Sequence, residues 1–482
     1  MRISRRRALK TTAIAAGAAA LPWSFSTSAY GANDRIRMAV IGLKGRGRSH
    51  MGGFSENIVA LCDCDEAVLN ASVESFAGDQ KDRVIDAETD FRRVIDRKDI
   101  DAVSIATPNH THSLIAIMAA QAGKDVYVEK PVSHNVWEGR QLALAARRHK
   151  RIIQCGTQGR SSLAIQQAVQ FVRDGKLGKI KCVIGTCYKP RPSIGRVDKP
   201  LEIPKSVDYD LWCGPAAKVP LYRPKLHYDW HWDFNTGNGD MGNQGIHQMD
   251  IARWFLGVDA LSPVVLSAGG RLGYEDAGNT PNSQVIYHGY ETPLIFETRG
   301  LPSSKEGQKT WGASMDQYRG SHVGVIVQCE EGHVLATSNY NQIQAFDNDG
   351  EVIKTFEGSV DHYANFLDAV RSRKPEDLNA EVLEGHLSSA LCHTGNISHR
   401  LGDQMSTREI ASKIGSNARF ADSFDRLAAH LEANEVDVDS AAITFGPQLE
   451  MDPETERFTN NDDANQLLTR EYRKPFVVPS FA

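Results

Sequence analysis

The sequence predicts an α/β protein in which a parallel sheet comes first and a larger, partly antiparallel sheet follows. Short apolar runs alternate with helical stretches as far as residue 157, which is typical of a parallel sheet covered by helices on both faces. Beyond that point, strand-like runs indicate an α+β domain. With 482 residues the chain is long enough for two or three domains with separate cores.

Composition excludes several classes of protein. The chain is 41% hydrophobic and 24% charged, unlike collagens, low-complexity chains or disulfide miniproteins. Its formal net charge is −5, and without the leader described next the balance is 50 basic against 60 acidic residues, or −10. An acidic body without a long basic run argues against nucleic acid as a partner. The eight cysteines lack the spacing of a metal site, so no metal is predicted. Most of the cysteines are expected to be buried free thiols, with one or two disulfides as an alternative.

Residues 1–32 resemble a twin-arginine export signal. Arg5, Arg6 and Arg7 precede a short alanine-rich apolar stretch, and small residues follow it; Ala8 stands where phenylalanine is more usual. A basic amphipathic start is the alternative. The apolar stretch is too short and too weakly apolar to be a good spanning helix. We therefore expect the twin-arginine translocase as a partner, a periplasmic or otherwise exported location, and a mature chain without a membrane span.

The first domain is predicted over residues 33–157. Its apolar strands are expected at residues 36–41, 58–63, 102–106, 125–129 and 151–155, with helices near 110–122 and 136–149. In a sheet of this kind, ligands bind beyond the carboxyl ends of the strands. Residues that directly follow these strands are therefore the candidates for a binding site.

A glycine-rich turn follows the first strand. Glycines let the backbone approach a pyrophosphate, and free N–H groups at the start of a helix bind the anion. Lys44 stands where the G-x-G-x-x-G pattern has its second glycine, and Gly45 can supply the flexibility instead. Lys44 or Arg46 then either touches phosphate or points to solvent. The alternative is an ordinary tight turn between Gly42 and Gly47.

Asp63 ends the second strand, 21 residues after Gly42. A carboxylate at this place can accept hydrogen bonds from both ribose hydroxyls of a dinucleotide. It would repel a 2′-phosphate, so it favours NAD over NADP. Strand, glycines, helix and acid together predict a Rossmann domain that binds NAD.

Motifs further along the chain resemble the Gfo/Idh/MocA family, the group of glucose–fructose oxidoreductase and inositol dehydrogenase. The most specific are Glu129-Lys130-Pro131 and the earlier strand end with Thr107, Pro108, Asn109 and His112. The similarity extends over roughly residues 35–402 and includes the stretches 154–160, 239–250, 362–370 and 384–386. A twin-arginine export signal like the one at residues 1–32 is also typical of a subset of this family.

The resemblance implies a fold and a cofactor site. The second domain, residues 158–482, would be an α+β domain with a large, mostly antiparallel open-faced sheet that binds substrate and joins subunits into a homo-oligomer, a dimer or tetramer. The cofactor, a tightly bound NAD, would contact Gly42, Lys44, Gly45, Arg46, Gly47, Asp63, Thr107, Pro108, Asn109, His112, Glu129, Lys130 and Gln158.

The resemblance also implies catalytic roles for Lys130, Asn243 and His247. Lys130 would lie near the nicotinamide and hydrogen-bond the reacting hydroxyl. Family dehydrogenases carry Asp-x-x-x-His on a helix, predicted here at about 242–256, but this chain has Asn243 in place of the acid. Three alternatives follow. His247 is the base with Asn243 as a positioning group, or Lys130 takes a larger part in proton transfer. In the third, His247 is a histidine of the core without a catalytic role.

Other polar residues near this helix have open roles. Asp250 is a site residue or a structural acceptor, and Asp240 is a candidate helix N-cap. An aromatic segment at residues 188–240 suits sugar rings, with core and loop packing as the alternative. The predicted substrate residues are Lys130, Arg160, Tyr188, His231, Asn243 and His247.

The last 80 residues are less informative. A helix near 424–435 and a strand near 443–445 are expected. The acidic run at 452–463 is predicted to be a solvated loop, and the tail at 470–481 to dock on the body.

These features predict an exported NAD-dependent oxidoreductase that acts on a sugar, glycoside or cyclitol. Two alternatives stay open. One is an epimerising or glycoside-cleaving enzyme that works through a transient keto sugar. The other is a carbohydrate-binding protein with weakened chemistry, which the departures at Lys44 and Asn243 motivate.

Overall fold

The first sheet of the described chain has six parallel strands in the order β3-β2-β1-β4-β5-β6. They are β1 (Met38–Ile41), β2 (Ile58–Cys62), β3 (Asp86–Glu88), β4 (Ala102–Ile105), β5 (Asp125–Val128) and β6 (Ile153–Cys155). The computed structural model describes residues 35–79, 84–440 and 442–481, so the predicted export signal lies outside the described residues. The five strands expected from the sequence are confirmed, and β3 is an additional edge strand.

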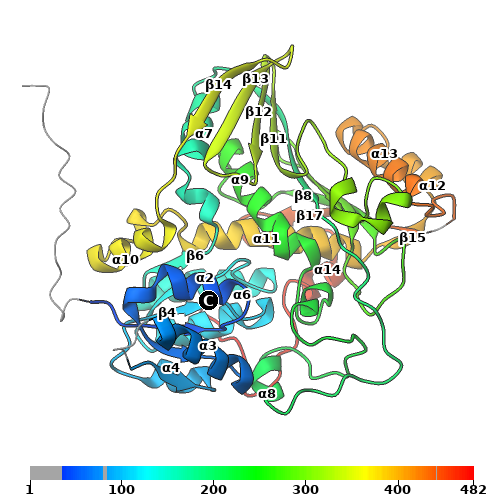
Figure 1. Ribbon diagram of the computed structural model, residues 1–482. Coiled ribbons are helices and arrows are strands. Elements are labelled where there is room, and N and C mark those ends of the chain that lie inside the picture. Colours follow the sequence, from blue (N-terminus) through cyan, green and yellow to red (C-terminus); the bar gives the residue numbers. More distant parts are fainter. Residues whose placement is uncertain (1–34, 80–83, 441, 482) are drawn as a thin grey trace, which may run out of the picture. The chain divides into compact units, whose positions relative to one another are not determined.

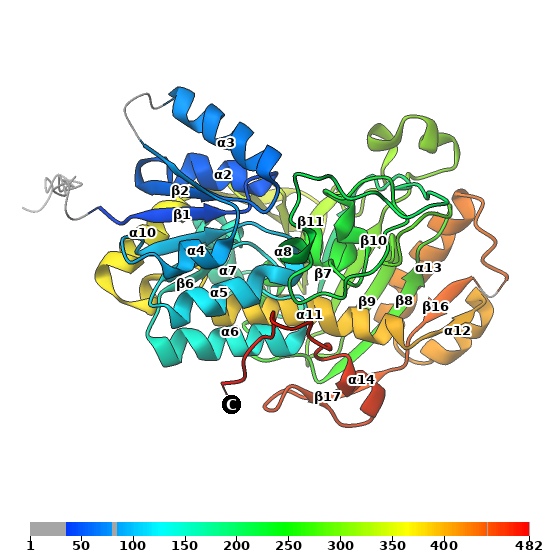
Figure 2. The same ribbon diagram turned by 90° about the horizontal axis from the view of Figure 1, so that it is seen from below.

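Helices cover both faces of this sheet (Figure 2). One face carries α2 (Arg46–Gly53), α3 (Glu66–Asp79) and α10 (His362–Ser372), and the other carries α4 (Phe91–Asp96), α5 (His112–Gln121) and α6 (Val136–His149). Strands β1, β4 and β5 are therefore buried at every position, which explains why their sequences are apolar except at Ser104 and Asp125.

The second sheet has twelve strands within the described residues and is antiparallel except where β10 pairs with β7. Its main path is β14-β13-β12-β11-β7-β10-β9-β8-β16-β15, and a β17–β18 hairpin attaches to β8. The strands are β7 (Ile180–Tyr188), β8 (Val264–Gly270), β9 (Ser283–His288), β10 (Leu294–Arg299), β11 (Val323–Cys329), β12 (Gly332–Thr337), β13 (Gln342–Asp347), β14 (Val352–Glu357), β15 (Asp403–Met405), β16 (Ile443–Phe445), β17 (Leu449–Asp452) and β18 (Arg457–Phe458). The predicted fold class is thus confirmed.

The two faces of the second sheet have different coverings (Figure 1). One face packs on α7 (Leu163–Arg173), α9 (Ile246–Leu256) and α11 (Val382–Arg400). On the other face, α12 (Thr407–Ile414) and α13 (Ala418–Ala433) cover β8, β9 and β10. The open face expected from the sequence is therefore restricted to the β11–β14 end, where Val352 and Ile353 are exposed.

The acidic run at 452–463 is exposed at Glu454, Asp462 and Asp463, as the sequence predicts, but it is not a plain loop. It contains the turn of the β17–β18 hairpin, strand β18 and the start of α14 (Asp462–Gln466). Glu456, between the two strands, is buried, forms an ion pair with Arg140 and accepts a hydrogen bond from His386. A buried acid with two partners is stabilised in a way that the local sequence does not reveal.

The carboxyl-terminal tail docks on the first domain, as predicted. Phe476 and Val478 are buried in the apolar cluster that includes α4, α5 and α6. The guanidinium of Arg473 donates to Asp210 and to the carbonyl of Gly214. Both views show this segment running back beside α6 (Figures 1 and 2).

Two further observations concern the whole described chain. In residues 35–79, 84–440 and 442–481, no helix has the length and apolar character needed to cross a bilayer. All eight cysteines fall in this part of the chain as free thiols, seven of them buried and Cys64 partly exposed.

Candidate functional site

A cavity of about 500 Å³ lies at the carboxyl edge of the first sheet. Its walls come from the turns after β1, β2, β3, β4 and β5, as the doubly wound topology predicts. Of the predicted cofactor residues, the following line it: Gly42, Lys44, Gly45, Arg46, Asp63, Thr107, Pro108, Asn109, His112, Glu129 and Lys130. Gly47 and Gln158 are not among its lining residues. The cavity thus brings together residues that are scattered over almost 90 positions of sequence.

Close packing explains the first and last glycines of the turn. Gly42 has φ +86°, and a Cβ there would lie 2.7 Å from backbone atoms of Ala106 and Thr107. A Cβ on Gly47 would lie 2.1 Å from the carbonyl oxygen of Gly42. Lys44 is exposed and is not among the residues with positive φ, so a side chain is accommodated at this position.

The turn presents free hydrogen-bond donors at the start of α2. The amide N–H groups of Lys44, Gly45 and Arg46 form no hydrogen bond with the rest of the described chain. The helix has no side-chain cap at Gly45 and no acid in its first turn. Unpaired amides at a helix N-terminus, beside exposed cations, are the donor set that suits a pyrophosphate.

Asp63 faces the same cavity from the end of β2. Its carboxylate accepts from the amide of Leu43 at 2.9 Å and from the amide of Asp65 at 3.0 Å. Burial raises the pKa of Asp63, although both amides counter that effect. Each oxygen keeps a further lone pair for an incoming hydroxyl, so this carboxylate fits the ribose of a dinucleotide. The residues present therefore fit NAD at both the phosphate and the ribose.

Glu129 is the most heavily bonded group at the opposite end of the cavity. Its Oε1 accepts from Arg46 Nε at 3.0 Å, His50 Nε2 at 3.1 Å and Gln158 Nε2 at 3.4 Å. Burial opposes its ionisation, but the His50 hydrogen bond and the Arg46 charge outweigh burial and hold its pKa well below the usual range. Glu129 therefore ties the glycine turn to β5 and braces Lys130, whose amide it also accepts.

Glu129→Gln is expected to lower the free energy of unfolding by about 2 kcal/mol at pH 7, because an amide accepts weakly from Arg46 and His50. Since the folded pKa is depressed, this stabilisation exists above the unfolded pKa of about 4.3 and is lost as the pH falls below it. Urea unfolding of both proteins at pH 7 and pH 4 checks this. A difference that is equal at the two pH values would contradict it.

Lys130 and Asn243 meet at the inner end of the cavity. Lys130 Nζ donates to the backbone carbonyl of Asn243 at 2.5 Å, and both residues line the cavity. Burial lowers the pKa of Lys130 although the Glu129 charge acts in the opposite direction. An amine with a depressed pKa exchanges a proton more readily near neutral pH, which suits a group beside a reacting hydroxyl.

The helix predicted at 242–256 begins differently from the expectation. Residues Met241–Gly245 form a π-helical turn, and the regular α9 starts at Ile246. A Cβ on Gly245 would lie 2.9 Å from the ring of Phe296, so tight packing on β10 accompanies this wider turn. The assumption of one straight helical face through Asn243 and His247 is therefore wrong.

His247 is partly exposed and does not line the cavity. Its ring lies 6.2 Å from that of Tyr340, and its nitrogens form no hydrogen bond with the described residues. Desolvation by the surrounding protein, followed by the Lys130 charge, lowers its pKa to about 3, so the imidazole is neutral at ordinary pH and is a weak base.

Several residues with open roles are bound to partners. Asp250 accepts two hydrogen bonds from Arg160, at 2.9 and 2.8 Å, and one from Ser388, so it is a structural acceptor. Arg160 lies outside the cavity lining. Asp240 does not cap a helix as predicted; it forms a bidentate pair with Arg191 instead.

The remaining predicted substrate residues lie in two places. Tyr188 is buried and donates to Glu297 at 2.6 Å, away from the cavity. His231 lines the cavity, and its ring stacks on Trp230 with a centroid distance of 3.6 Å. Burial lowers its pKa to about 3, and the charge of Lys130 adds to this effect. Within the described residues no group of His, Cys, Asp and Glu side chains is placed to hold a metal ion.

Sequence reasoning missed part of the cavity wall near Asp63. The additional lining residues include Leu43, Cys64, Thr89, Phe91, Ile115 and Leu211. Thr89 and Phe91 directly follow β3, so recognition of that edge strand would have found them. Leu211 comes from the second domain, and only the tertiary fold brings it here.

Two sequence models of one protein family match the chain. The Gfo/Idh/MocA oxidoreductase family model for the NAD-binding Rossmann fold matches residues 36–157. The model for a C-terminal alpha/beta domain of this oxidoreductase family matches residues 180–294.

Known proteins show similarity to parts of the chain. The levoglucosan dehydrogenase of Pseudarthrobacter phenanthrenivorans is 27% identical over 180 residues, which is 37% of this chain and 39% of that protein. A glycosyl hydrolase family 109 protein of Shewanella sp. (strain MR-4) is 29% identical over 157 residues, 30% of this chain and 34% of that protein. The chain thus aligns with less than two fifths of the length of these relatives.

Solved structures share the fold over most of the chain. The WlbA dehydrogenase from Bordetella pertussis, in complex with NADH and UDP-GlcNAcA, aligns with a TM-score of 0.51 and 17% identity. The alignment covers 74% of this chain and 94% of that one. A putative oxidoreductase from Klebsiella pneumoniae aligns with a TM-score of 0.51 over 90% of this chain and 98% of its own, at 16% identity.

Proposed function

The chain belongs to the Gfo/Idh/MocA oxidoreductase family, and on that premise we propose that it oxidises a CH–OH group of a sugar, glycoside or cyclitol with NAD. One observation carries the proposal. A single cavity joins the unpaired amides of the glycine turn, the carboxylate of Asp63 and the amine of Lys130. Bound NAD would supply the hydride acceptor.

The chain's own residues would then orient the substrate and move its proton. The Lys130 amine hydrogen-bonds the reacting hydroxyl, and its lowered pKa favours proton exchange. His247 is the alternative acceptor, with Asn243 as a positioning group, although its lowered pKa disfavours protonation. His231 also lines the cavity, near Lys130, and is a further candidate for contact with the substrate. The carboxylate of Asp63 disfavours a 2′-phosphate, so the proposed cofactor is NAD and not NADP.

The proposal includes export and a retained cofactor. The arginine-rich leader supports passage through the twin-arginine translocase, which carries folded proteins. Outside the cytoplasm no nicotinamide pool is replenished, so NAD that is reduced and reoxidised within one cycle suits this location. We also propose that subunits meet through the uncovered β11–β14 end of the second sheet, where Val352 and Ile353 are exposed.

A second candidate is cleavage or epimerisation of a glycoside through a keto sugar. Similarity to a glycosyl hydrolase family 109 protein supports it as much as similarity to a dehydrogenase supports simple oxidation. Oxidation of one sugar carbon to a ketone acidifies the neighbouring C–H bond and permits elimination. A carbohydrate-binding protein with weakened chemistry is the rival, since Asn243 cannot stabilise an imidazolium as a carboxylate does.

The purified protein is expected to carry stoichiometric NAD(H) when it is produced with its leader in cells that can load it. Acid denaturation followed by an enzymatic nucleotide assay of the supernatant measures this. A panel of sugars, cyclitols and glycosides is then added while nicotinamide absorbance and products are followed together. Repeated absence of nucleotide would overturn the closed cycle, and sugar binding without any absorbance change would favour the rival.

A further inference from the structure

A segment of the second domain lies across the candidate cofactor cavity. We name residues 206–231 the strap. It contains the short helix α8 (Tyr209–Cys213) and the start of the turn Asp229–Trp232. Six of its residues line the cavity: Leu211, Trp212, His227, Tyr228, Trp230 and His231. None of them falls in the part of the chain that matches the NAD-binding family model, residues 36–157.

The strap is attached beside the end of β2, next to Asp63. The amide of Glu66 donates to the carbonyl of Ser206, and the amide of Asp208 donates to the carbonyl of Cys64, each at 2.8 Å. His227 Nε2 donates to Asp65 Oδ2 at 2.9 Å. The Asp65 side chain is only 7% exposed and that of His227 is 30% exposed, so this ion pair is partly shielded from solvent.

The attachment lies at the end of the groove that suits adenosine. In this topology β2 and β3 border one half of the groove and β5 the other, and Asp63 follows β2. At the far end of the strap, His231 is close enough to Lys130 for that charge to lower its pKa. The strap therefore follows the groove from the candidate ribose site towards the candidate reaction site.

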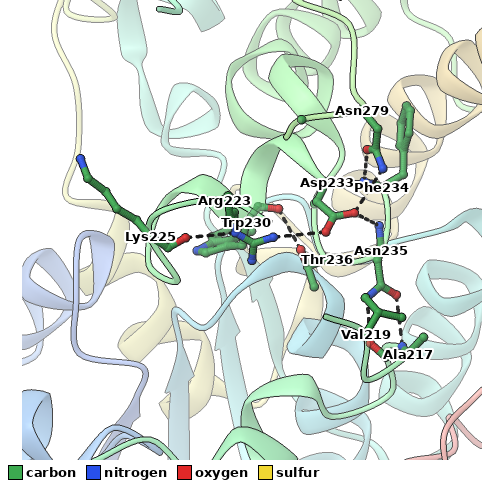
Figure 3. A network of polar contacts seen from close by, with 12 residues as sticks. Ala217, Val219, Arg223, Lys225, Trp230, Asp233, Phe234, Asn235, Thr236 and Asn279 are labelled. Atoms are coloured by element: carbon green, nitrogen blue, oxygen red, sulfur yellow. Dashed lines mark hydrogen bonds and ion pairs between the residues drawn. The ribbon is translucent and has the colours of Figure 1, made fainter. Parts of the chain in front are cut away.

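Contacts within the strap, together with contacts to Asp233 and Thr236 just after it, hold the shape of the strap. Its side chains Val207, Trp212, Cys213, Leu221 and Leu226 form a small apolar cluster, with Cys64 packed against it. Figure 3 shows the polar contacts that support this cluster: Arg223 donates to Asp233 at 3.2 Å and to the Lys225 carbonyl at 3.1 Å. The Thr236 hydroxyl donates to the Trp230 carbonyl at 2.9 Å. Movement of the strap therefore depends on its attachments, which besides those at Cys64, Asp65 and Glu66 include His110 at the Trp212 carbonyl and Arg473 at Asp210.

We propose that the strap is the outer wall of the dinucleotide site and that the His227–Asp65 pair holds it closed over the adenosine half. The wall offers indole rings and a leucine, which suit the faces of an adenine base. A dinucleotide under this wall leaves only after the pair at Asp65 has opened. The inference rests on the proposed function, because it requires that the cavity binds NAD.

The test is the dissociation rate of NADH from the loaded protein, measured by the loss of bound-state fluorescence after addition of excess NAD. His227→Ala is expected to raise this rate roughly tenfold, the effect of losing one partly buried charge-assisted hydrogen bond. His227→Gln keeps a donor towards Asp65, so its rate should fall between the two. Lys225→Ala is the matched control, because Lys225 is exposed on the same strap and does not line the cavity.

The outcomes separate the two proposals. A wild-type protein that neither carries nor binds NADH overturns the proposed function, and this inference with it. Binding that is normal, with the same dissociation rate in wild type and His227→Ala, overturns the strap alone. If His227→Ala yields no folded protein, the His227→Gln rate decides: a rate equal to that of wild type and Lys225→Ala overturns the strap, and a clear rise supports it.

Discussion

Replacement of Lys130 with alanine is expected to lower turnover by about a thousandfold while NAD stays bound. The amine is the cation at the inner end of the cavity, and general acid–base groups contribute about 10²–10⁴-fold to rates. The phosphate and ribose contacts lie at the glycine turn and Asp63, so the change leaves them intact. Steady-state kinetics on an identified substrate, together with the nucleotide content of the denatured protein, measure both quantities.

His247→Ala tests whether the proton acceptor is instead the imidazole. Turnover should also be abolished in this variant if His247 is the base, whereas a modest loss would leave Lys130 as the main proton carrier. Lys225→Ala is a suitable control, because Lys225 is exposed and does not line the cavity. Wild-type turnover in both Lys130→Ala and His247→Ala would place the reaction elsewhere.

Gly47→Ala is expected to destabilise the protein by about 3 kcal/mol and to weaken NAD binding at least about tenfold. The added Cβ would lie 2.1 Å from the carbonyl oxygen of Gly42, and neither backbone segment can yield without shifting the start of α2. That shift moves the unpaired amides of Lys44 to Arg46, which are the candidate phosphate donors. Thermal unfolding and a titration with NADH measure the two effects.

Gly52→Ala provides the matched control on the same helix. A Cβ at Gly52 would meet no atom within 4 Å, and its φ is not positive. Alanine favours helix, so this variant should be stabilised by about 0.5 kcal/mol and bind NADH normally. Equal stability and equal NADH affinity of Gly47→Ala and Gly52→Ala would show that the close approach of Gly47 to Gly42 affects neither folding nor cofactor binding.

The parallel sheet and its groove could be predicted because their signals are local. Five of the six strands are short, mostly apolar runs, and Gly42, Asp63, Thr107 and Glu129 lie within two residues of strand ends that must share one edge. Knowledge of the strands was therefore enough to place these residues around one cavity. The edge strand β3 escaped notice because two of its three residues, Asp86 and Glu88, are acidic and all three are exposed or half-buried.

Contacts between distant segments could not be predicted. The pair between Asp65 and His227 joins residues 162 positions apart, and nothing in the aromatic segment indicates which side chain meets the first domain. Likewise Glu456 reads as part of a solvated acidic run until Arg140 and His386 are placed beside it. In both cases the partner is supplied by tertiary packing and not by local pattern.

At Asn243 the prediction failed for a different reason, an irregularity of the backbone. The sequence pattern assumed a regular helix, whose spacing would align Asn243 with His247 on one face. Gly245 packs against Phe296 within a π-helical turn, and this places the Asn243 carbonyl where Lys130 Nζ can reach it. A backbone irregularity of this kind depends on the surface that the turn packs on.

The returning tail has a consequence for biosynthesis. Phe476 and Val478 complete an apolar cluster whose other members are mostly contributed by the first third of the sequence. The first domain therefore cannot finish assembling while the ribosome is still translating the second. Burial of Phe476 and Val478 is thus a late step of folding, which follows synthesis of the second domain.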